Sequence, residues 1–211
     1  MISDKYSFVY VRNAKTASTS LMHWKHGPLK KSLTEWYVPE AAESRAHDKH
    51  HVPYQILKEY LNAEQVDTYF SFGLVRNPYD RLFSAFNYAK NWYMSPELNV
   101  NNVKPKNPGV AENNFRRWLY TEYELHGYQG KYASQHYYLN GCIYVGKFET
   151  LAQDINNILK CIGLPTTTLE LVNESTFSGS YVDQYDTELK NFVYNTFEED
   201  FDIYQYSKKI S

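Results

Sequence analysis

The chain has 211 residues and a mass of 24.9 kDa, which is the size of one domain. Hydrophobic residues make up 43% of it, which is enough for a packed core and excludes wholesale disorder. The 22 Lys and Arg residues nearly balance the 24 Asp and Glu residues, which argues against a general nucleic-acid binder. Tyrosine is in excess, with 21 residues, and indicates an interface, a carbohydrate-facing cleft or a tyrosine-rich core.

The cysteine content and the hydropathy pattern indicate the cellular compartment in which the protein is expected. Only Cys142 and Cys161 are present, so no disulfide framework is possible, and we expect two buried thiols rather than one bridge. No apolar run approaches the ~20 residues that span a bilayer. The first residues enter a β-like run without the apolar segment of a signal peptide. We therefore expect a soluble, cytoplasmic protein without a membrane span; the sequence does not indicate its oligomeric state.

The chain alternates between strand-like and helix-like segments. Residues 6–11 form a run of β-branched and aromatic residues typical of a buried strand, and a small-residue loop and a helix around Leu21 follow. A second strand over 69–75 precedes a helix from Pro78 to about Trp92, which has one apolar stripe at helical spacing, formed by Tyr79, Leu82, Phe83 and Phe86. The other expected segments, in chain order, are an irregular stretch over 26–48, a helix over 52–61, a loop over 95–109, a helix over 112–125, a strand over 142–145 and helices over 151–162 and 186–197.

This alternation predicts an α/β fold with a parallel sheet. We expect a single domain over residues 1–211, with 95–130 as an insertion. Ligands of such folds lie at the carboxyl ends of the strands. The loops after Val11 and Val75 are both at that edge.

The first of these loops, Arg12 to Ser20, has the composition of an anion-binding loop. It contains two cations, no acid, and small Ala, Ser and Thr residues that allow backbone N–H groups to approach a ligand. Lys15 adds a mobile charge. The Walker A pattern is absent, because no glycine precedes the lysine. The alternative is that Ser18, Thr19 and Ser20 only cap a helix.

The second loop offers another anion site. Arg76 ends a strand, Pro78 begins a helix, and Ser84 lies off the apolar stripe of that helix. An arginine at a strand end and a serine two turns into the next helix can bind one phosphate from two directions. Arg81 could join them. The alternatives are a structural ion pair for Arg76 and a surface ion pair of Arg81 with Asp80 or Glu97.

These segments resemble a known family. Residues 8–21 (FVYVRNAKTASTSL) are similar to the 5'-phosphosulfate loop of sulfotransferases that use 3'-phosphoadenosine-5'-phosphosulfate (PAPS), and residues 72–86 (FGLVRNPYDRLFSAF) to their 3'-phosphate motif. The nearest resemblance is to carbohydrate sulfotransferases (sulfotransferase family 2) and their bacterial relatives. Further similarities are Lys49-His50 ahead of a helix, residues 145–151 (VGKFETL), Ser134-Gln135 in place of a Pro-Gln pair, and a C-terminal pattern of Asn173, Ser175, Tyr181, Tyr185, Asp200 and Tyr206.

The resemblance implies a P-loop-NTPase-like three-layer α/β/α fold with a central parallel sheet, and an enzyme that transfers a sulfuryl group from PAPS to an acceptor hydroxyl. Lys15 would stabilise the leaving oxygen. We expect a carbohydrate acceptor, and no nucleic-acid partner. The donor-binding residues that the resemblance implies are Lys15, Thr16, Ala17, Ser18, Thr19, Ser20, Arg76 and Ser84.

A hydroxyl acceptor requires a base, and histidine suits that role near neutral pH. His50 and His51 are the candidates, with Glu43 and Asp48 as alternatives. We expect no metal, because His47, His50 and His51 lack the spacing of a helical ligand pair.

Two other functions stay open on the sequence. One is a nucleotide kinase or another P-loop phosphotransferase, and the other is a non-catalytic nucleotide-binding module. For the acceptor cleft, the hypothesis is that it is lined by some of the tyrosines in and after the least family-like stretch, the candidates being Tyr120, Tyr123, Tyr128, Tyr132, Tyr137 and Tyr138.

Overall fold

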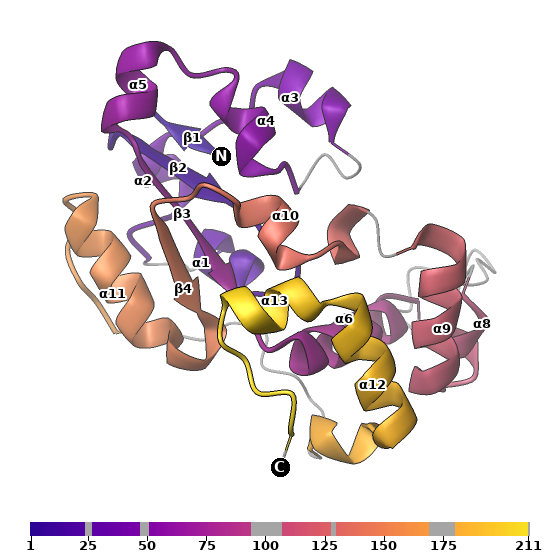
Figure 1. The fold of residues 1–211 in the computed structure, drawn as a ribbon. Helices are drawn as coiled ribbons and strands as arrows, with labels where there is room; N and C mark the ends of the chain where they lie inside the picture. The colour runs from indigo at the N-terminus through magenta and orange to yellow at the C-terminus, as the bar shows by residue number, and fades with distance from the viewer. Residues whose placement is uncertain (24–26, 47–50, 94–106, 128–129, 169–179, 211) are drawn as a thin grey trace. The chain divides into compact units, whose positions relative to one another are not determined.

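A computed structural model of the protein describes residues 1–23, 27–46, 51–93, 107–127, 130–168 and 180–210 (Figure 1). The chain divides into two compact units. The first, here called the sheet unit, comprises Met1–Arg76 and Ala133–Glu174. The second, the helical unit, comprises Asn77–Tyr132 and Ser175–Ser211.

The sheet unit contains a four-stranded sheet in the order β1-β2-β3-β4. Its strands are β1 (Ile2–Ser3), β2 (Phe8–Val11), β3 (Phe70–Val75) and β4 (Tyr144–Lys147). The last three are parallel, while β1 pairs antiparallel with β2. The predicted α/β fold with a parallel sheet is therefore confirmed, with one short antiparallel edge strand that the sequence analysis missed. A two-residue strand is too short to produce a detectable alternation of polar and apolar residues.

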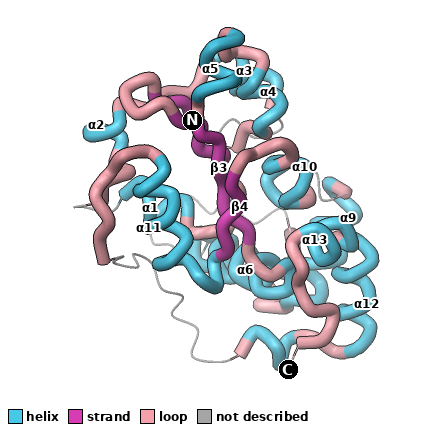
Figure 2. The backbone as a smooth tube through the Cα atoms, turned by 60° about the vertical axis from the view of Figure 1, so that its left-hand side comes forward, coloured by secondary structure: helices cyan, strands magenta, loops and turns pink. Residues whose placement is uncertain are grey.

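Helices cover both faces of this sheet, as a three-layer arrangement requires. The helices of the unit are α1 (Ser18–His23), α2 (Lys31–Thr34), α3 (Glu40–Arg45), α4 (Tyr54–Lys58), α5 (Ala63–Thr68), α10 (Gln135–Leu139) and α11 (Leu151–Cys161). Helices α1 and α11 lie on one side of the strands and α10 on the other (Figure 2). On the first side, Phe72 and Leu74 of β3 share a buried cluster with Leu21 of α1 and Ile158 of α11.

The opposite face of β3 has no side chain at its centre, because Gly73 lies there. A Cβ atom on Gly73 would lie 2.2 Å from Cδ2 of Leu139 and 3.1 Å from the carbonyl oxygen of Val11. Helix α10 therefore packs directly on the backbone of β3. This close approach places the first residue of α10, Gln135, near the carboxyl end of the strand.

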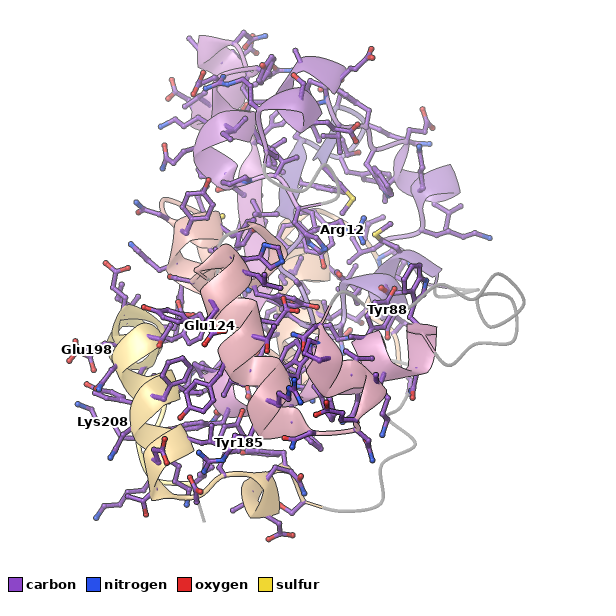
Figure 3. The ribbon with its side chains drawn as sticks, turned by 90° about the vertical axis from the view of Figure 1, so that its right-hand side faces the viewer. Arg12, Tyr88, Glu124, Tyr185, Glu198 and Lys208 are labelled. Carbon is purple, nitrogen blue, oxygen red and sulfur yellow. The ribbon has the colours of Figure 1, made fainter. Side chains whose placement is uncertain are left out.

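The helical unit has an aromatic core. Its helices are α6 (Pro78–Tyr93), α8 (Pro108–Ala111), α9 (Phe115–His126), α12 (Thr187–Thr196) and α13 (Glu198–Ile203). The predicted apolar stripe of α6 is confirmed, since Tyr79, Leu82, Phe83 and Phe86 are all buried. Tyr185, labelled in Figure 3, donates a hydrogen bond of 2.8 Å from its hydroxyl to the carbonyl oxygen of Tyr79. Their rings meet edge to face, with centroids 5.1 Å apart.

Several sequence predictions need correction. The stretch 26–48, expected to be irregular, contains α2 and α3, and both α5 and α10 were missed. These helices have four to six residues, too few to show a helical period. The third parallel strand begins two residues later than predicted, at Tyr144. Of the proposed insertion 95–130, residues 95–106 and 128–129 lie outside the described residues.

The two cysteines are free thiols, and they differ in environment. Cys142 is half-buried, and its burial raises the pKa of the thiol to about 12. Cys161, at the end of α11, is exposed, so the prediction of two buried thiols is wrong for Cys161. Among the helices of the described residues, none has the length and apolar character needed to cross a membrane.

Candidate active site

The first predicted anion loop follows β2 directly. Arg12, labelled in Figure 3, opens it, and α1 begins at Ser18. Lys15 and Ala17 both have φ of 67°, in the left-handed region that L-residues rarely adopt. Backbone in which right- and left-handed conformations alternate forms concave groups of N–H donors that bind anions. Two such outliers within three residues therefore support a functional loop rather than a simple helix cap.

Buried polar side chains hold this loop in place. The hydroxyl of Thr16 donates to the carbonyl oxygen of Asn13 at 3.0 Å, and both residues are fully buried. The Nδ2 group of Asn13 donates to the carbonyl oxygen of Leu74 on β3 at 3.2 Å and to Oε1 of Gln135 at 3.1 Å. The hydroxyl of Thr16 is thus part of the structure of the loop. Ser18 and Ser20 are also buried, and Thr19 is exposed.

Arg76 brings the second predicted anion site to the same edge of the sheet unit. Its Nη1 group donates to the carbonyl oxygen of Lys15 at 3.3 Å. Its guanidinium carbon lies 4.0 Å from the centroid of the Phe148 ring, a cation–π contact. The cationic residues of the two sequence motifs are therefore in contact at the carboxyl ends of β2 and β3. A guanidinium has five N–H donors, so the bond to Lys15 is compatible with binding an anion as well.

Gln135 is a residue of this site that the sequence analysis noted only as part of a resemblance. Its Oε1 accepts a hydrogen bond of 2.9 Å from the backbone N–H of Arg76, and its Nε2 donates one of 2.9 Å to the carbonyl oxygen of Arg76. The side chain is fully buried. No local pattern marks it as functional, because it lies 59 residues along the chain from its partner.

His51 lies beside the start of the first loop. Its Nδ1 atom is 3.2 Å from the carbonyl oxygen of Arg12, and its ring meets that of Tyr138 edge to face at 6.5 Å between centroids. A carbonyl oxygen only accepts hydrogen bonds, so Nδ1 carries a hydrogen in this contact. Of the other candidate bases, Glu43 is half-buried on α3. His50 and Asp48 lie outside the described residues.

The histidine group considered as a metal site is only partly described, since His47 and His50 are outside the described residues. Within those residues, no group of three or more His, Cys, Asp or Glu side chains could hold a metal ion.

The motif over residues 145–151 has a structural basis. Asp154 accepts hydrogen bonds from the hydroxyls of Tyr144 and Thr150, each at 2.5 Å, and from the backbone N–H of Lys147 at 3.0 Å. A Cβ atom on Gly146 would lie 2.8 Å from Cβ of Asp154, so glycine is needed at this position. Together these contacts fix the turn that carries Phe148 beneath Arg76.

Ser84, the other residue of the predicted 3'-phosphate site, belongs to the helical unit. It is half-buried on α6, off the stripe that packs into the core. Its pairing with Arg76 stays a prediction. For Arg81, the surface position is wrong: it is only 2% exposed, donates to the carbonyl oxygen of Tyr132 at 3.2 Å, and lies over the ring of Phe197. Of the two acids considered as its partners, Glu97 lies outside the described residues.

The tyrosines proposed to line an acceptor cleft have different environments. Tyr132 and Tyr138 are buried in the core of their respective units, so the candidates that remain for a cleft are among the other four. Tyr120 is half-buried, and its hydroxyl donates to Glu188 at 2.8 Å. Tyr123 and Tyr137 are exposed, at 45% and 44%. Tyr128 lies outside the described residues.

The sheet and this cationic edge define an α/β protein with a candidate anion-binding site at the carboxyl ends of parallel strands. The family model of the sulfotransferase family matches residues 1–207, nearly the whole chain. The chain therefore belongs to the sulfotransferase family, and sulfuryl transfer is the class of reaction that this membership indicates. Comparisons with curated proteins and with solved structures returned no match.

Proposed function

We propose that this protein transfers the sulfuryl group of PAPS to a hydroxyl of an acceptor, which we expect to be a carbohydrate. The observation that carries the proposal is the contact between Arg76 and Lys15, which joins two cationic motifs at one edge of the sheet unit. PAPS has about four negative charges, divided between its 3'-phosphate and its 5'-phosphosulfate. Two cationic groups in a chain with a net charge of -2 suit such a ligand.

The donor would be held by both loops. Backbone N–H groups of Thr16 to Thr19 would bind the 5'-phosphate and the sulfuryl group, in keeping with the positive φ of Lys15 and Ala17. Arg76 would bind the 3'-phosphate together with Ser84, a pairing that rests on the family motif.

In the transfer step, the acceptor oxygen would attack sulfur in line with the bond between sulfur and the bridging oxygen. The new S–O bond forms as the bridging bond breaks, and 3'-phosphoadenosine-5'-phosphate (the bisphosphate) leaves with the electron pair. The ammonium of Lys15 would stabilise the charge that develops on the bridging oxygen. Most of the catalysis would come from positioning and charge stabilisation, as in phosphoryl transfer.

The proton of the acceptor hydroxyl would pass to a histidine. The contact between His51 and the carbonyl oxygen of Arg12 supports this role, since it holds an imidazole beside the loop that we propose binds the donor. His50 stays a candidate on the family motif. A cytoplasmic location is part of the same proposal, supported by two free thiols, which suit a reducing compartment.

Thermal unfolding in the presence of ligands tests the proposal. The bisphosphate should stabilise the protein, by about 2.7 kcal/mol at 100 times its dissociation constant. Adenosine 5'-monophosphate, which lacks the 3'-phosphate, is the matched control and should stabilise it less at the same concentration. Stabilisation by ATP with magnesium but not by the bisphosphate would instead favour a phosphotransferase.

Activity distinguishes an enzyme from a binding module. Radiolabelled sulfate should pass from PAPS to at least one member of a panel of glycans, phenols and lipids. Binding of the bisphosphate without transfer to any acceptor would favour a non-catalytic module. Transfer to a phenol or a lipid alone would overturn the carbohydrate acceptor.

A further inference from the structure

Arg76 is held by two side chains that come from outside its own motif. Gln135 binds both backbone polar groups of Arg76, and Phe148 lies under its guanidinium. We propose that Gln135 and Phe148 are positioning residues that fix Arg76 in the geometry needed to bind the 3'-phosphate of the donor. This inference rests on the proposed function.

The position of Arg76 in the sheet explains why a carboxamide is needed. The ladder of β3 ends at Val75, which is paired with Lys147 of β4, so Arg76 is the first residue beyond it. A carboxamide has one acceptor oxygen and a donor nitrogen, as a peptide group has. The side chain of Gln135 therefore substitutes for a neighbouring strand by pairing with the N–H and the carbonyl oxygen of Arg76, at 2.9 Å each.

The same carboxamide connects Arg76 to the first loop. Oε1 of Gln135 also accepts a hydrogen bond from Nδ2 of Asn13, and Asn13 in turn binds Leu74 of β3. Gln135 and Asn13 are both fully buried, so if these hydrogen bonds were lost, no water would replace them as partners of the buried polar groups. One side chain thus sets the spacing between the two anion loops.

Phe148 constrains the side chain of Arg76, as Gln135 constrains its backbone. An unrestrained arginine loses rotamer entropy when a ligand fixes it. The ring 4.0 Å from the guanidinium, and the bond from Nη1 to Lys15, restrict the side chain before the donor arrives. Preorganisation of this kind raises affinity without adding a contact to the ligand.

The test is the preference for the bisphosphate over adenosine 5'-monophosphate, measured as a ratio of dissociation constants. Gln135→Met keeps the volume of the side chain and removes its polar groups, and it should lower this preference about tenfold. Gln65→Met is the matched control, because the carboxamide of Gln65 also accepts from a backbone N–H, that of Asn62 at 2.9 Å, and donates through Nε2, but on α5, which precedes β3. This control should keep the preference of the original protein.

A purely structural role would weaken the binding of both nucleotides in proportion and leave the ratio unchanged. If Gln135 instead acts through Arg76, as we propose, Gln135→Met should have no further effect on the ratio in the background of Arg76→Ala. Phe148→Leu provides a second variant if Gln135→Met does not fold, because Phe148 is only half-buried. It should also lower the ratio, by about three- to tenfold.

The outcomes separate the two proposals. If the original protein shows no preference for the bisphosphate, the proposed donor site is wrong, and the positioning role is wrong with it. If the preference exists and survives both Gln135→Met and Phe148→Leu, the donor site stands and the positioning role is overturned.

Discussion

The Nδ1 atom of His51 lies 3.2 Å from the carbonyl oxygen of Arg12, the residue that opens the first anion loop. This contact orients the imidazole and assigns a hydrogen to Nδ1. The histidine is thus anchored to the same loop that we propose binds the sulfuryl group. A base held by the donor loop would keep a fixed distance from the transferred group.

If His51 is the base, His51→Ala should lower the turnover rate by a factor of about 10²–10⁴ while the affinity for the bisphosphate stays the same. Steady-state assays with PAPS and isothermal titration with the bisphosphate would measure the two effects separately. His126→Ala, at an exposed position on α9, is the control and should be active. A large loss in His50→Ala with little loss in His51→Ala would assign the role to His50.

Asp154 should be important for the stability of the sheet unit. Asp154→Ala removes the acceptor of three hydrogen bonds, and we expect it to lower the free energy of unfolding by about 3 kcal/mol. Urea denaturation would measure the change. Asp67→Ala, exposed on α5, should change stability by less than about 0.5 kcal/mol. Equal stability of the two variants would contradict the structural basis given for the motif over residues 145–151.

The helical unit should tolerate substitution at one glycine and not at another. A Cβ atom on Gly109 would lie 2.2 Å from the backbone nitrogen of Trp118, so Gly109→Ala should lower the free energy of unfolding by about 3 kcal/mol. Gly127 has φ of 54° at the end of α9, and a Cβ atom there meets no heavy atom within 4 Å. Because asparagine tolerates the left-handed region, Gly127→Asn should cost less than about 1 kcal/mol. Thermal denaturation of the two variants would show the difference.

The two thiols should differ in their reaction with iodoacetamide. Alkylation requires the thiolate, and the pKa of Cys142 is raised to about 12 by burial, so the fraction of its thiolate is small at pH 8. Mass spectrometry at that pH should find Cys161 modified and Cys142 unmodified. In a Cys161→Ser variant, the rate of modification at Cys142 should rise about tenfold per pH unit between pH 8 and pH 10. A rate that levels off by pH 9 would show that the thiol ionises normally.

The sequence predicted the parts of the molecule that depend on local pattern. The strand before Arg12, the strand before Arg76 and the stripe of α6 all appear where periodicity and composition indicated them. The roles of Gln135 and Phe148 were not predicted, because both depend on contacts between segments far apart in the chain. The burial of Arg81 was missed for a related reason: its partner Tyr132 comes from another part of the helical unit, and a charged residue is ordinarily expected at the surface.

A substitution at Gly73 could change activity even though Gly73 is not one of the residues that we propose bind the donor. Because the helix that begins with Gln135 packs against this bare stretch of backbone, even one methyl group at position 73 would push Leu139 outward. A displacement of that short helix would also move the carboxamide of Gln135 at its other end, which binds the backbone of Arg76. Substitution of Gly73 is thus expected to weaken donor binding. A search for inactivating mutations should therefore find substitutions at this position.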